Sequence, residues 1–286
     1  MEKQPLISVI VPAHNNATTI GATLQSMIDQ TYRNLEIIVV DDNSTDGTGE
    51  AVKPYLTKDT RISYYPLPFD DPHRVNKRGR NINAGYMSRN YALDRVRGEW
   101  ITFQDADDVS LLNRIEVQFN LAIKYNSSHV CMQWFGFKDE YVGKKMDADA
   151  ILRDHADSVL IPTEKILGVA HRSLGPIIPF IGPLNRIIPF EWKRLRIINK
   201  LFFGNLDPYP ATGNSPLIKR AVIEKVRFCP LPHRKWPSFA GRGADRDFNF
   251  KVATTFKDSI AFNIPMYLWR SGRPNPDFIG YEKYIY

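Results

Sequence analysis

The residues best suited to chemistry are the acids of the run DADD at 105–108, which directly follows an apolar, strand-like run. In extended chain, side chains two residues apart point the same way. Asp105 and Asp107 are therefore expected to share a face, roughly 6–7 Å apart at their Cα atoms. Two carboxylates at that spacing can bind one divalent cation and, through it, the phosphates of a ligand. We expect Asp108 to point elsewhere and to serve, with Ser110, the start of the following helix. Taken alone, the run could also be a polar turn, because acids are favoured where a helix begins.

Strands and helices alternate along the part of the chain that must position these acids. Continuous apolar runs predict buried strands, and apolar residues at helical spacing predict the helices between them. The expected strands lie at 6–11, 35–40, 61–65, 100–103 and 129–137, with a helix interrupted near Pro54 and another at 84–97. This alternation predicts an α/β fold with a mostly parallel sheet and helices on both faces. Such sheets bind ligands outside the carboxyl ends of their strands, where residues 12–15, 41–42 and 105–107 all fall.

Neither of the common phosphate-binding loops occurs in the sequence. The turn after the first strand lacks G-x-G-x-x-G, and G-x-x-x-x-G-K-[ST] is absent, which argues against a Rossmann dehydrogenase and a P-loop nucleotidase. A phosphate-bearing ligand would then be held by a metal and by basic side chains such as Arg89. The net charge of +7 is consistent with an anionic partner.

The composition is that of an ordinary globular protein. A chain of 286 residues can form one large α/β domain or two small ones. Cys131 and Cys229 offer neither a disulfide framework nor paired metal-ligand spacing, which favours a reducing compartment. The first apolar run is broken by Pro12 and has no small-residue cleavage site, so we interpret it as a strand rather than a signal peptide. No run reaches transmembrane length, and we expect a cytoplasmic protein.

Four motifs follow one another in a specific order. They are P-x-x-N at 12–15, D-D-x-S-x-D at 41–46, N-x-G-x-x-x-R-N at 83–90 and D-x-D-D at 105–108. In this order and spacing they resemble the family 2 glycosyltransferases with the GT-A fold. The resemblance is strong over residues 5–137 and weaker over 209–273.

The resemblance implies roles for particular residues. Those implied to bind the nucleotide sugar are Pro12, Ala13, Asn15, Asp42, Asn83, Arg89 and Asp105. In the family, the turn after the first strand lines the nucleotide base, and His14 stands here where Tyr is more usual. Asp42 would hydrogen-bond the uracil ring, and Asp105 would approach the ribose and the metal. Asp107 would coordinate the Mn²⁺ or Mg²⁺ that bridges the diphosphate.

The second half of the chain is implied to serve the acceptor. Residues 211–228 resemble the family's acceptor-side segment. A predicted helix start at Ala244 stands where the family has Gly-Glu-Asp, with Ala244 in place of Glu and Asp245 in the place of the catalytic base. Asp247 could instead only stabilise the helix start. The closing segment at 268–273 lacks the metal-binding His of many relatives, so water or the diphosphate would complete the coordination of the metal.

Residues 165–206 combine basic, apolar and aromatic side chains. Seven Lys and Arg accompany one Glu, a net charge of +6, and Pro179, Pro183 and Pro189 prevent one long helix. Such a stretch cannot span a bilayer. It can lie in the headgroup region of an anionic membrane, where each Lys or Arg contributes about 1 kcal/mol. Alternatively, it packs on the domain as an ordinary subdomain with a solvated basic rim.

We interpret the chain as one continuous domain in three parts. Residues 1–137 would bind the nucleotide sugar, 138–210 would form an inserted segment near the acceptor, and 211–286 would carry the catalytic base. The function predicted is an inverting, metal-dependent glycosyltransferase. It would move a sugar from a nucleotide sugar, expected to be UDP-linked, to a hydroxyl of a glycan or lipid-linked acceptor. The inner face of a membrane is its expected location if the inserted segment binds lipid.

Two alternatives stay open. An Asp-x-Asp phosphotransferase would also place acids at a strand end, as at 39–42, but gives no reason for the motif at 83–90. A basic module that binds nucleic acid or membranes is compatible with the charge. Aromatic residues are not interleaved with the basic loop at 74–80, and acids in the crevice would repel phosphate without a metal, so nucleic acid is not an expected partner.

Overall fold

The computed structural model describes six stretches of the chain and four single residues. They are residues 4–71, 85–174, 207–230, 233–236, 243–270 and 275–286, with Trp192, Leu195, Ile197 and Ile198. The predicted site residue Asn83, the basic loop at 74–80 and most of the segment 165–206 lie outside these residues. Within the described stretches, no helix is both long enough and apolar enough to cross a membrane.

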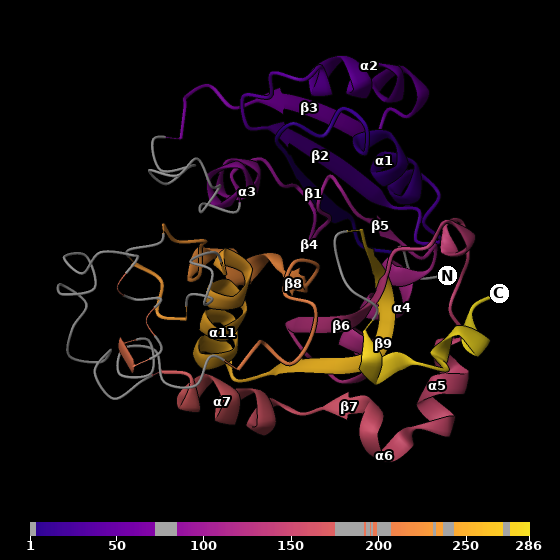
Figure 1. Ribbon diagram of the computed structural model, residues 1–286, viewed down its shortest axis with the longest axis vertical. Coiled ribbons are helices and arrows are strands. Elements are labelled where there is room, and N and C mark those ends of the chain that lie inside the picture. The colour runs from indigo at the N-terminus through magenta and orange to yellow at the C-terminus, as the bar shows by residue number, and fades with distance from the viewer. Residues whose placement is uncertain are drawn as a thin grey trace.

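The first four strands form a parallel sheet in the order β3-β2-β1-β4 (Figure 1). They are β1 (Ile7–Ala13), β2 (Leu35–Asp41), β3 (Ile62–Pro66) and β4 (Trp100–Phe103). Every residue of β2 and β4 is buried, as expected of strands covered on both faces. This half of the sheet has the predicted parallel arrangement, and the carboxyl ends of its strands meet at one edge.

The sheet continues with strands of mixed direction, in the order β8-β6-β9-β5 after β4. These strands are β5 (Val109–Ser110), β6 (His129–Gly136), β8 (Leu217–Lys219) and β9 (Ser259–Trp269), and β7 (Leu160–Ile161) also pairs with β9. Pairing is antiparallel for β4 with β8, β8 with β6 and β9 with β5, and parallel for β6 with β9. The predicted parallel arrangement therefore holds among the first four strands and for β6 with β9, whereas the short strands β5, β7 and β8 pair antiparallel. Elements of two or three residues, such as β5 and β8, are too short to show a period in sequence.

Helices cover both faces of the sheet. Alternate side chains of β1 therefore enter two separate cores. Val9 packs with α1 (Ile20–Ile28), α2 (Thr48–Lys58) and α4 (Arg114–Lys124). Ile10 packs with α3 (Tyr86–Leu93) and α11 (Ala244–Phe256) on the opposite face. The alternation follows from the two-residue period of a strand. The fold is thus a three-layer α/β arrangement, which agrees with the predicted class.

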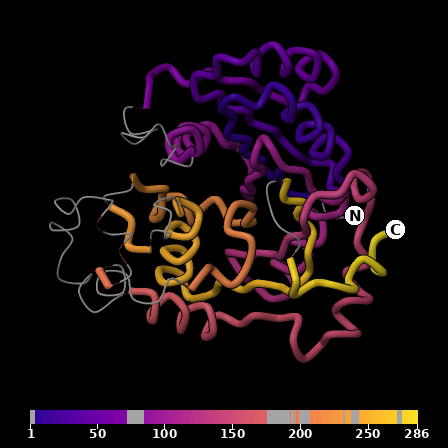
Figure 2. Tube along the Cα trace, in the orientation of Figure 1, coloured from indigo at the N-terminus to yellow at the C-terminus, as the bar shows by residue number. Residues whose placement is uncertain are grey.

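The remaining helices lie between or after the strands in the chain. They are α5 (Ala148–Asp154), α6 (Ala156–Val159), α7 (Thr163–Arg172) and the 3₁₀ helices η1 (Asp139–Tyr141), η3 (Arg220–Glu224), η5 (Pro276–Phe278) and η6 (Tyr281–Tyr284). The C-terminal tail returns to the segment before α5, where Met146 and Ile285 form a β-bridge (Figure 2). Its end is therefore held against the body of the protein.

The segment after β4 differs from its prediction. Helix α4 begins at Arg114, so Asp108 and Ser110 do not start it, and Ser110 belongs to β5 instead. The chain turns at the acids, where the Asp108 N–H donates to the Asp105 carbonyl over 3.1 Å. The prediction for Asp108 and Ser110 was wrong because β9 supplies pairing partners that the local sequence does not reveal. Similarly, Pro54 lies inside α2 without interrupting it.

Candidate active site

A cavity of about 670 Å³ opens at the carboxyl ends of β1, β2 and β4. Its walls come from the turns after these strands, the start of α3, the loop at 208–214, the start of α11 and the ends of β6 and β9. Of the predicted site residues, those that line it are Pro12, Ala13, Asp42, Arg89, Asp105, Asp107 and Asp245. The structure thus brings together residues that are spread over most of the chain.

The turns after β1 and β2 are joined by hydrogen bonds. The His14 ring donates from Nδ1 to the Asp42 carbonyl over 2.6 Å, and the Asp42 N–H donates to the Ala13 carbonyl over 2.7 Å. His14 lines the cavity, whereas Asn15 is not among the lining residues. Asn15 has a left-handed φ of 56°, and its side-chain oxygen accepts from the Thr45 N–H over 2.9 Å. Asn15 therefore braces the turn that presents its neighbours.

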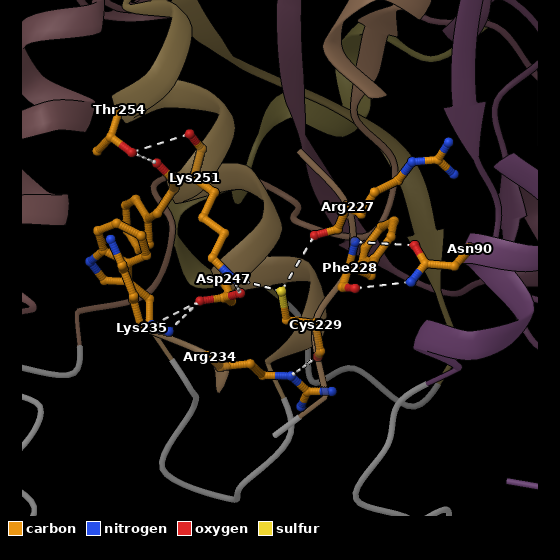
Figure 3. Close-up of polar contacts among 11 residues, drawn as sticks. Asn90, Arg227, Phe228, Cys229, Arg234, Lys235, Asp247, Lys251 and Thr254 are labelled. Atoms are coloured by element: carbon orange, nitrogen blue, oxygen red, sulfur yellow. Dashed lines mark hydrogen bonds and ion pairs between the residues drawn. The ribbon is translucent and has the colours of Figure 1, made fainter. Parts of the chain in front are cut away.

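The start of α3 brings Arg89 to Asp105, just beyond the end of β4. Gly85 precedes this helix with φ 65°, and a Cβ there would lie 3.3 Å from Arg89 Nη1 and 3.5 Å from the Pro12 side chain. Such close approach at positive φ favours glycine. Asn90 exchanges hydrogen bonds with the backbone of Phe228, at 2.9 and 3.2 Å, which ties α3 to the second half of the chain (Figure 3).

Asp105 is held from three directions. Arg89 forms an ion pair with Asp105 Oδ1 at 2.5 Å, and the Arg89 side chain is only 6% exposed. The Asn214 amide donates to Oδ2 over 2.8 Å, and the Asp105 N–H donates to the Tyr267 hydroxyl over 3.2 Å. Burial raises the pKa of Asp105 above its usual range, against the lowering effect of Arg89 and Asn214, and the charges of Asp107 and Asp245 add to the rise.

The other two acids of the run complete a cluster of carboxylates. One oxygen from each of Asp105, Asp107 and Asp108 lies within 4.8 Å of the other two. Asp108 is buried and accepts from the Tyr267 hydroxyl at 2.9 Å and from the Arg270 N–H at 2.8 Å. Burial raises the pKa of Asp108 to about 8, assisted by the charges of Asp105 and Asp107. The sequence interpretation missed Asp108 as a member because it assumed extended chain, and the turn brings Asp108 back.

This cluster fits a hard divalent cation. Oxygen ligands suit Mg²⁺ and Mn²⁺, and a cation would offset the repulsion among three carboxylates. Among the residues that the structure describes, none donates a hydrogen bond to the Asp107 side chain, so its oxygens remain available. Both oxygens of Asp105 and of Asp108 already accept hydrogen bonds. Asp107 is thus the best placed to bind a metal directly.

The two acids at the start of α11 have different surroundings. Asp245 lines the cavity, and a Cβ on Gly213 would lie 3.0 Å from its Oδ2. Asp247 is fully buried and accepts from the backbone N–H groups of Lys235 and Trp236, at 2.6 and 3.0 Å, and from Lys251 Nζ at 2.5 Å (Figure 3). No such donors reach the Asp245 carboxylate from the described residues. Asp245 is therefore free to act on a ligand, whereas Asp247 holds the local structure.

Two tryptophans form a further wall. Trp134 from β6 and Trp269 from β9 line the cavity and contact each other edge to face, with ring centroids 5.0 Å apart. Arg246 also lines it, and burial lowers the pKa of this guanidinium to about 10. The sequence interpretation missed Trp134, Arg246 and Asn214 as site residues. No local pattern signals them, because strand β6, helix α11 and the loop at 208–214 meet at the cavity only in the folded chain.

Comparison with known proteins agrees with this picture. Residues 8–192 match the sequence model of glycosyl transferase family 2. One relative is the UDP-Glc:alpha-D-GlcNAc-diphosphoundecaprenol beta-1,3-glucosyltransferase WfgD of Escherichia coli, 35% identical over 123 residues, or 43% of each chain. The chain spans less than half the length of the curated relatives it matches.

Solved structures share the fold. S. aureus TarS in complex with UDP has a TM-score of 0.57 at 17% identity, over 93% of this chain and 60% of that one. TarS with UDP-GlcNAc also gives 0.57, at 15% identity, over 94% and 59%. The mannosyltransferase PcManGT from Pyrobaculum calidifontis, in complex with GDP-Man and Mn²⁺, gives 0.50 at 18% identity, over 99% and 60%. The fold is therefore of the GT-A type, and the chain belongs to glycosyl transferase family 2.

Proposed function

We propose that the protein transfers a sugar from a UDP-linked donor to a hydroxyl of a glycan or lipid-linked acceptor. The reaction inverts the anomeric centre and depends on Mn²⁺ or Mg²⁺. In this proposal, residues 1–137 bind the nucleotide sugar, 138–210 border the acceptor, and 211–286 carry the base. The family membership, and the UDP and UDP-GlcNAc complexes of TarS, support the choice of donor.

One observation carries the proposal: a single cavity contains both the carboxylate cluster and Asp245. Asp245 is near enough to Asp105 for its charge to raise the pKa of that residue. An inverting transfer needs a base on one side of the anomeric carbon and a stabilised leaving group on the other. Residues 212–214 line the cavity beside both groups, with Asn214 at Asp105 and Gly213 at Asp245. A simple polar turn at 105–108 would not require this arrangement.

Each residue has a distinct part in the proposed reaction. Pro12, Ala13 and Asp42 line the end of the cavity where the uracil ring binds, and Arg89 orients Asp105 toward the ribose. Asp107, with Asp105, holds the divalent ion, which when bound neutralises the charge of the departing diphosphate. Asp245 takes the proton from the acceptor hydroxyl as that oxygen forms its bond to the anomeric carbon. The acceptor gains the sugar, and UDP leaves with the former glycosidic oxygen.

A lipid-linked acceptor is supported by the relative WfgD, which is named as a glucosyltransferase acting on alpha-D-GlcNAc-diphosphoundecaprenol. The segment 165–206 would bring such an acceptor within reach by contact with an anionic membrane. Of its residues that the structure describes, Trp192, Leu195 and Ile197 are exposed apolar side chains. Cosedimentation with anionic liposomes at low and high salt tests the membrane contact. It compares the parent with a variant in which Lys193, Arg194 and Arg196 are changed to Glu. Equal binding by the parent and the variant would contradict the membrane contact.

The central test is a screen of nucleotide sugars for metal-dependent release of UDP, with and without candidate glycan and lipid-linked acceptors. We expect one UDP-sugar to give release of UDP. This release should require Mn²⁺ or Mg²⁺ and should increase when the correct acceptor is present. Product analysis then gives the anomeric configuration, and retention would contradict the inverting mechanism. An aspartyl-phosphate formed without sugar transfer would instead support the phosphotransferase alternative.

A further inference from the structure

One buried hydroxyl in the cavity wall, that of Thr212, has no partner among the residues that the structure describes. Thr212 is 6% exposed and lines the cavity, and its Oγ1 makes no hydrogen bond with the part of the chain that the structure describes. Its backbone N–H donates to the Met132 carbonyl over 2.8 Å, which fixes the residue against β6. Burying a hydroxyl without a partner is unfavourable, and such groups in native proteins call for an explanation. Solvent does not reach this oxygen where it lies, so a ligand in the cavity supplies the missing partner when the Thr212 side chain turns its hydroxyl to the cavity surface.

The neighbours of Thr212 show which part of a ligand it would meet. The Asn214 amide donates to Asp105 Oδ2 over 2.8 Å, at the acid that anchors the donor. Gly213 lies against the proposed base, because a Cβ there would be 3.0 Å from Asp245 Oδ2. The Asn249 side chain donates to the Gly213 carbonyl over 2.7 Å and so holds the loop on α11. The loop at 212–214 therefore borders the space between the donor anchor and the base.

In the proposed reaction, the sugar being transferred occupies that space. Its anomeric carbon must lie between the diphosphate, near Asp105 and Asp107, and the acceptor oxygen, near Asp245. The nucleotide base binds at Pro12 and Asp42, on the other strands of the sheet edge. A side chain beside Gly213 is thus placed against the sugar ring.

We propose that the Thr212 hydroxyl binds a ring hydroxyl of the transferred sugar and helps to select that sugar. The inference rests on the proposed function, because it requires a UDP-sugar donor. A hydroxyl can both donate and accept, so it can pair with a sugar hydroxyl in either sense. A sugar that lacks or inverts that hydroxyl leaves Thr212 unpaired again and binds less tightly. Sites that pair buried polar groups with a substrate hydroxyl discriminate strongly against analogues without it.

Two substitutions separate hydrogen bonding from packing. Thr212→Val keeps the shape and removes the hydroxyl, and Thr212→Ser keeps the hydroxyl. The matched control is Thr254→Val, on the helix that carries the base but outside the cavity lining. Its hydroxyl donates to the Phe250 carbonyl over 2.8 Å (Figure 3 shows the residue). Without ligand, Thr212→Val should melt at or above the temperature of the parent, because it removes an unpaired buried group.

The experiment is calorimetric titration, with Mn²⁺ present, of UDP, UDP-glucose, UDP-galactose and UDP-GlcNAc into the parent and the three variants. We expect Thr212→Val to lower the affinity for the preferred UDP-sugar by about 3–10-fold, the value of one hydrogen bond, and to leave UDP affinity unchanged. Thr212→Ser and Thr254→Val should keep the parental ratio of UDP-sugar to UDP affinity.

An unchanged ratio in Thr212→Val would overturn the inference. So would an equal loss in Thr212→Ser, since packing rather than the hydroxyl would then be responsible. If the proposed function is wrong, the result differs: the parent itself would bind neither UDP nor any of the three UDP-sugars. The preference among these sugars should also narrow in Thr212→Val, because the hydroxyl that distinguishes them is gone.

Discussion

The Tyr267 hydroxyl connects two acids of the same turn: it donates to Asp108 over 2.9 Å and accepts from the Asp105 N–H over 3.2 Å. Tyr267 lies in β9, so a strand near the end of the chain fixes the geometry of the carboxylate cluster after β4. The cluster is therefore a product of both halves of the sheet. The geometry of the carboxylate cluster should therefore depend on Tyr267, a side chain that does not itself bind a metal.

Tyr267→Phe should weaken metal binding and reduce stability. It removes a donor from buried Asp108 and an acceptor from the Asp105 N–H, which costs about 1–3 kcal/mol in the free energy of unfolding. Chemical unfolding with and without Mn²⁺ measures both effects. Tyr284→Phe is the control, because its hydroxyl donates to Asp154 over 2.7 Å at the far end of the sheet. An equal metal affinity in Tyr267→Phe and Tyr284→Phe would contradict the proposed role of Tyr267.

Asp107→Asn should abolish activity and weaken metal-dependent UDP binding while leaving the fold intact. Asp107 makes no hydrogen bond through its side chain with the described residues, so its loss removes a ligand without breaking a structural contact. UDP binding with and without Mn²⁺ or Mg²⁺, together with the melting temperature, tests this. Asp149→Asn, at an exposed position in α5, is the matched control. Full activity of Asp107→Asn, or of the parent in a chelator, would refute the metal assignment.

Asp245→Asn should bind UDP like the parent but transfer sugar about 10²–10⁴-fold more slowly, the usual effect of removing a general base. Asp247→Asn should act mainly on stability, because it leaves buried Lys251 without its counter-charge, a loss of about 3–5 kcal/mol. Turnover and unfolding measured on both variants separate the two roles. The assignment of the base is wrong if Asp247→Asn is folded and inactive while Asp245→Asn is active.

Glu36 should make stability depend on pH in the acid range. Its buried carboxylate accepts from Ser8 Oγ at 2.5 Å and from the Arg97 N–H and Nε at 2.6 and 2.7 Å. Burial alone raises the pKa of Glu36, but these hydrogen bonds and the Arg97 charge hold it below its usual range. Because the pKa is lower in the folded state, the stabilisation is complete above the unfolded value of about 4.3 and is lost as pH falls through the folded value.

Glu36→Gln should therefore be less stable than the parent at pH 7, and the difference should shrink as the pH falls below about 4. Urea unfolding across this pH range measures the change. Glu50→Gln serves as the control, since Glu50 pairs with Lys53 at an exposed position. A difference between parent and Glu36→Gln that stays constant down to pH 3 would show that the charge of Glu36 is not responsible.

Apolar patterns in the sequence predicted the strands that carry the first half of the site. The apolar runs at 6–11, 35–40 and 100–103 identified three neighbouring strands, because strands buried on both faces are largely apolar. Their order in the sheet then placed Pro12, Asp42 and Asp105 at one edge. Asp245 was found only through the resemblance to a family, since an acid at the start of a helix has an ordinary structural explanation.

The remaining parts of the site depend on contacts between distant residues. Asp108 was assigned to a helix start because nothing near it in the sequence indicates its partner Tyr267 in β9. Trp134 and Trp269 appear in sequence as ordinary strand residues, and only the parallel pairing of β6 with β9 makes them neighbours. The register of such pairs is set by packing across the whole sheet, which a single sequence does not display.

The position of β8 between β4 and β6 has a consequence for synthesis on the ribosome. The first four strands can pair as soon as residues up to Phe103 have emerged, but β4 then keeps one open edge. That edge is paired only when Leu217–Lys219 has been made. Open edges invite pairing with other chains, and long-range strand pairing is slow. The nascent chain is therefore most exposed to misassembly while its middle third is being translated, and a fragment that stops before β8 should aggregate.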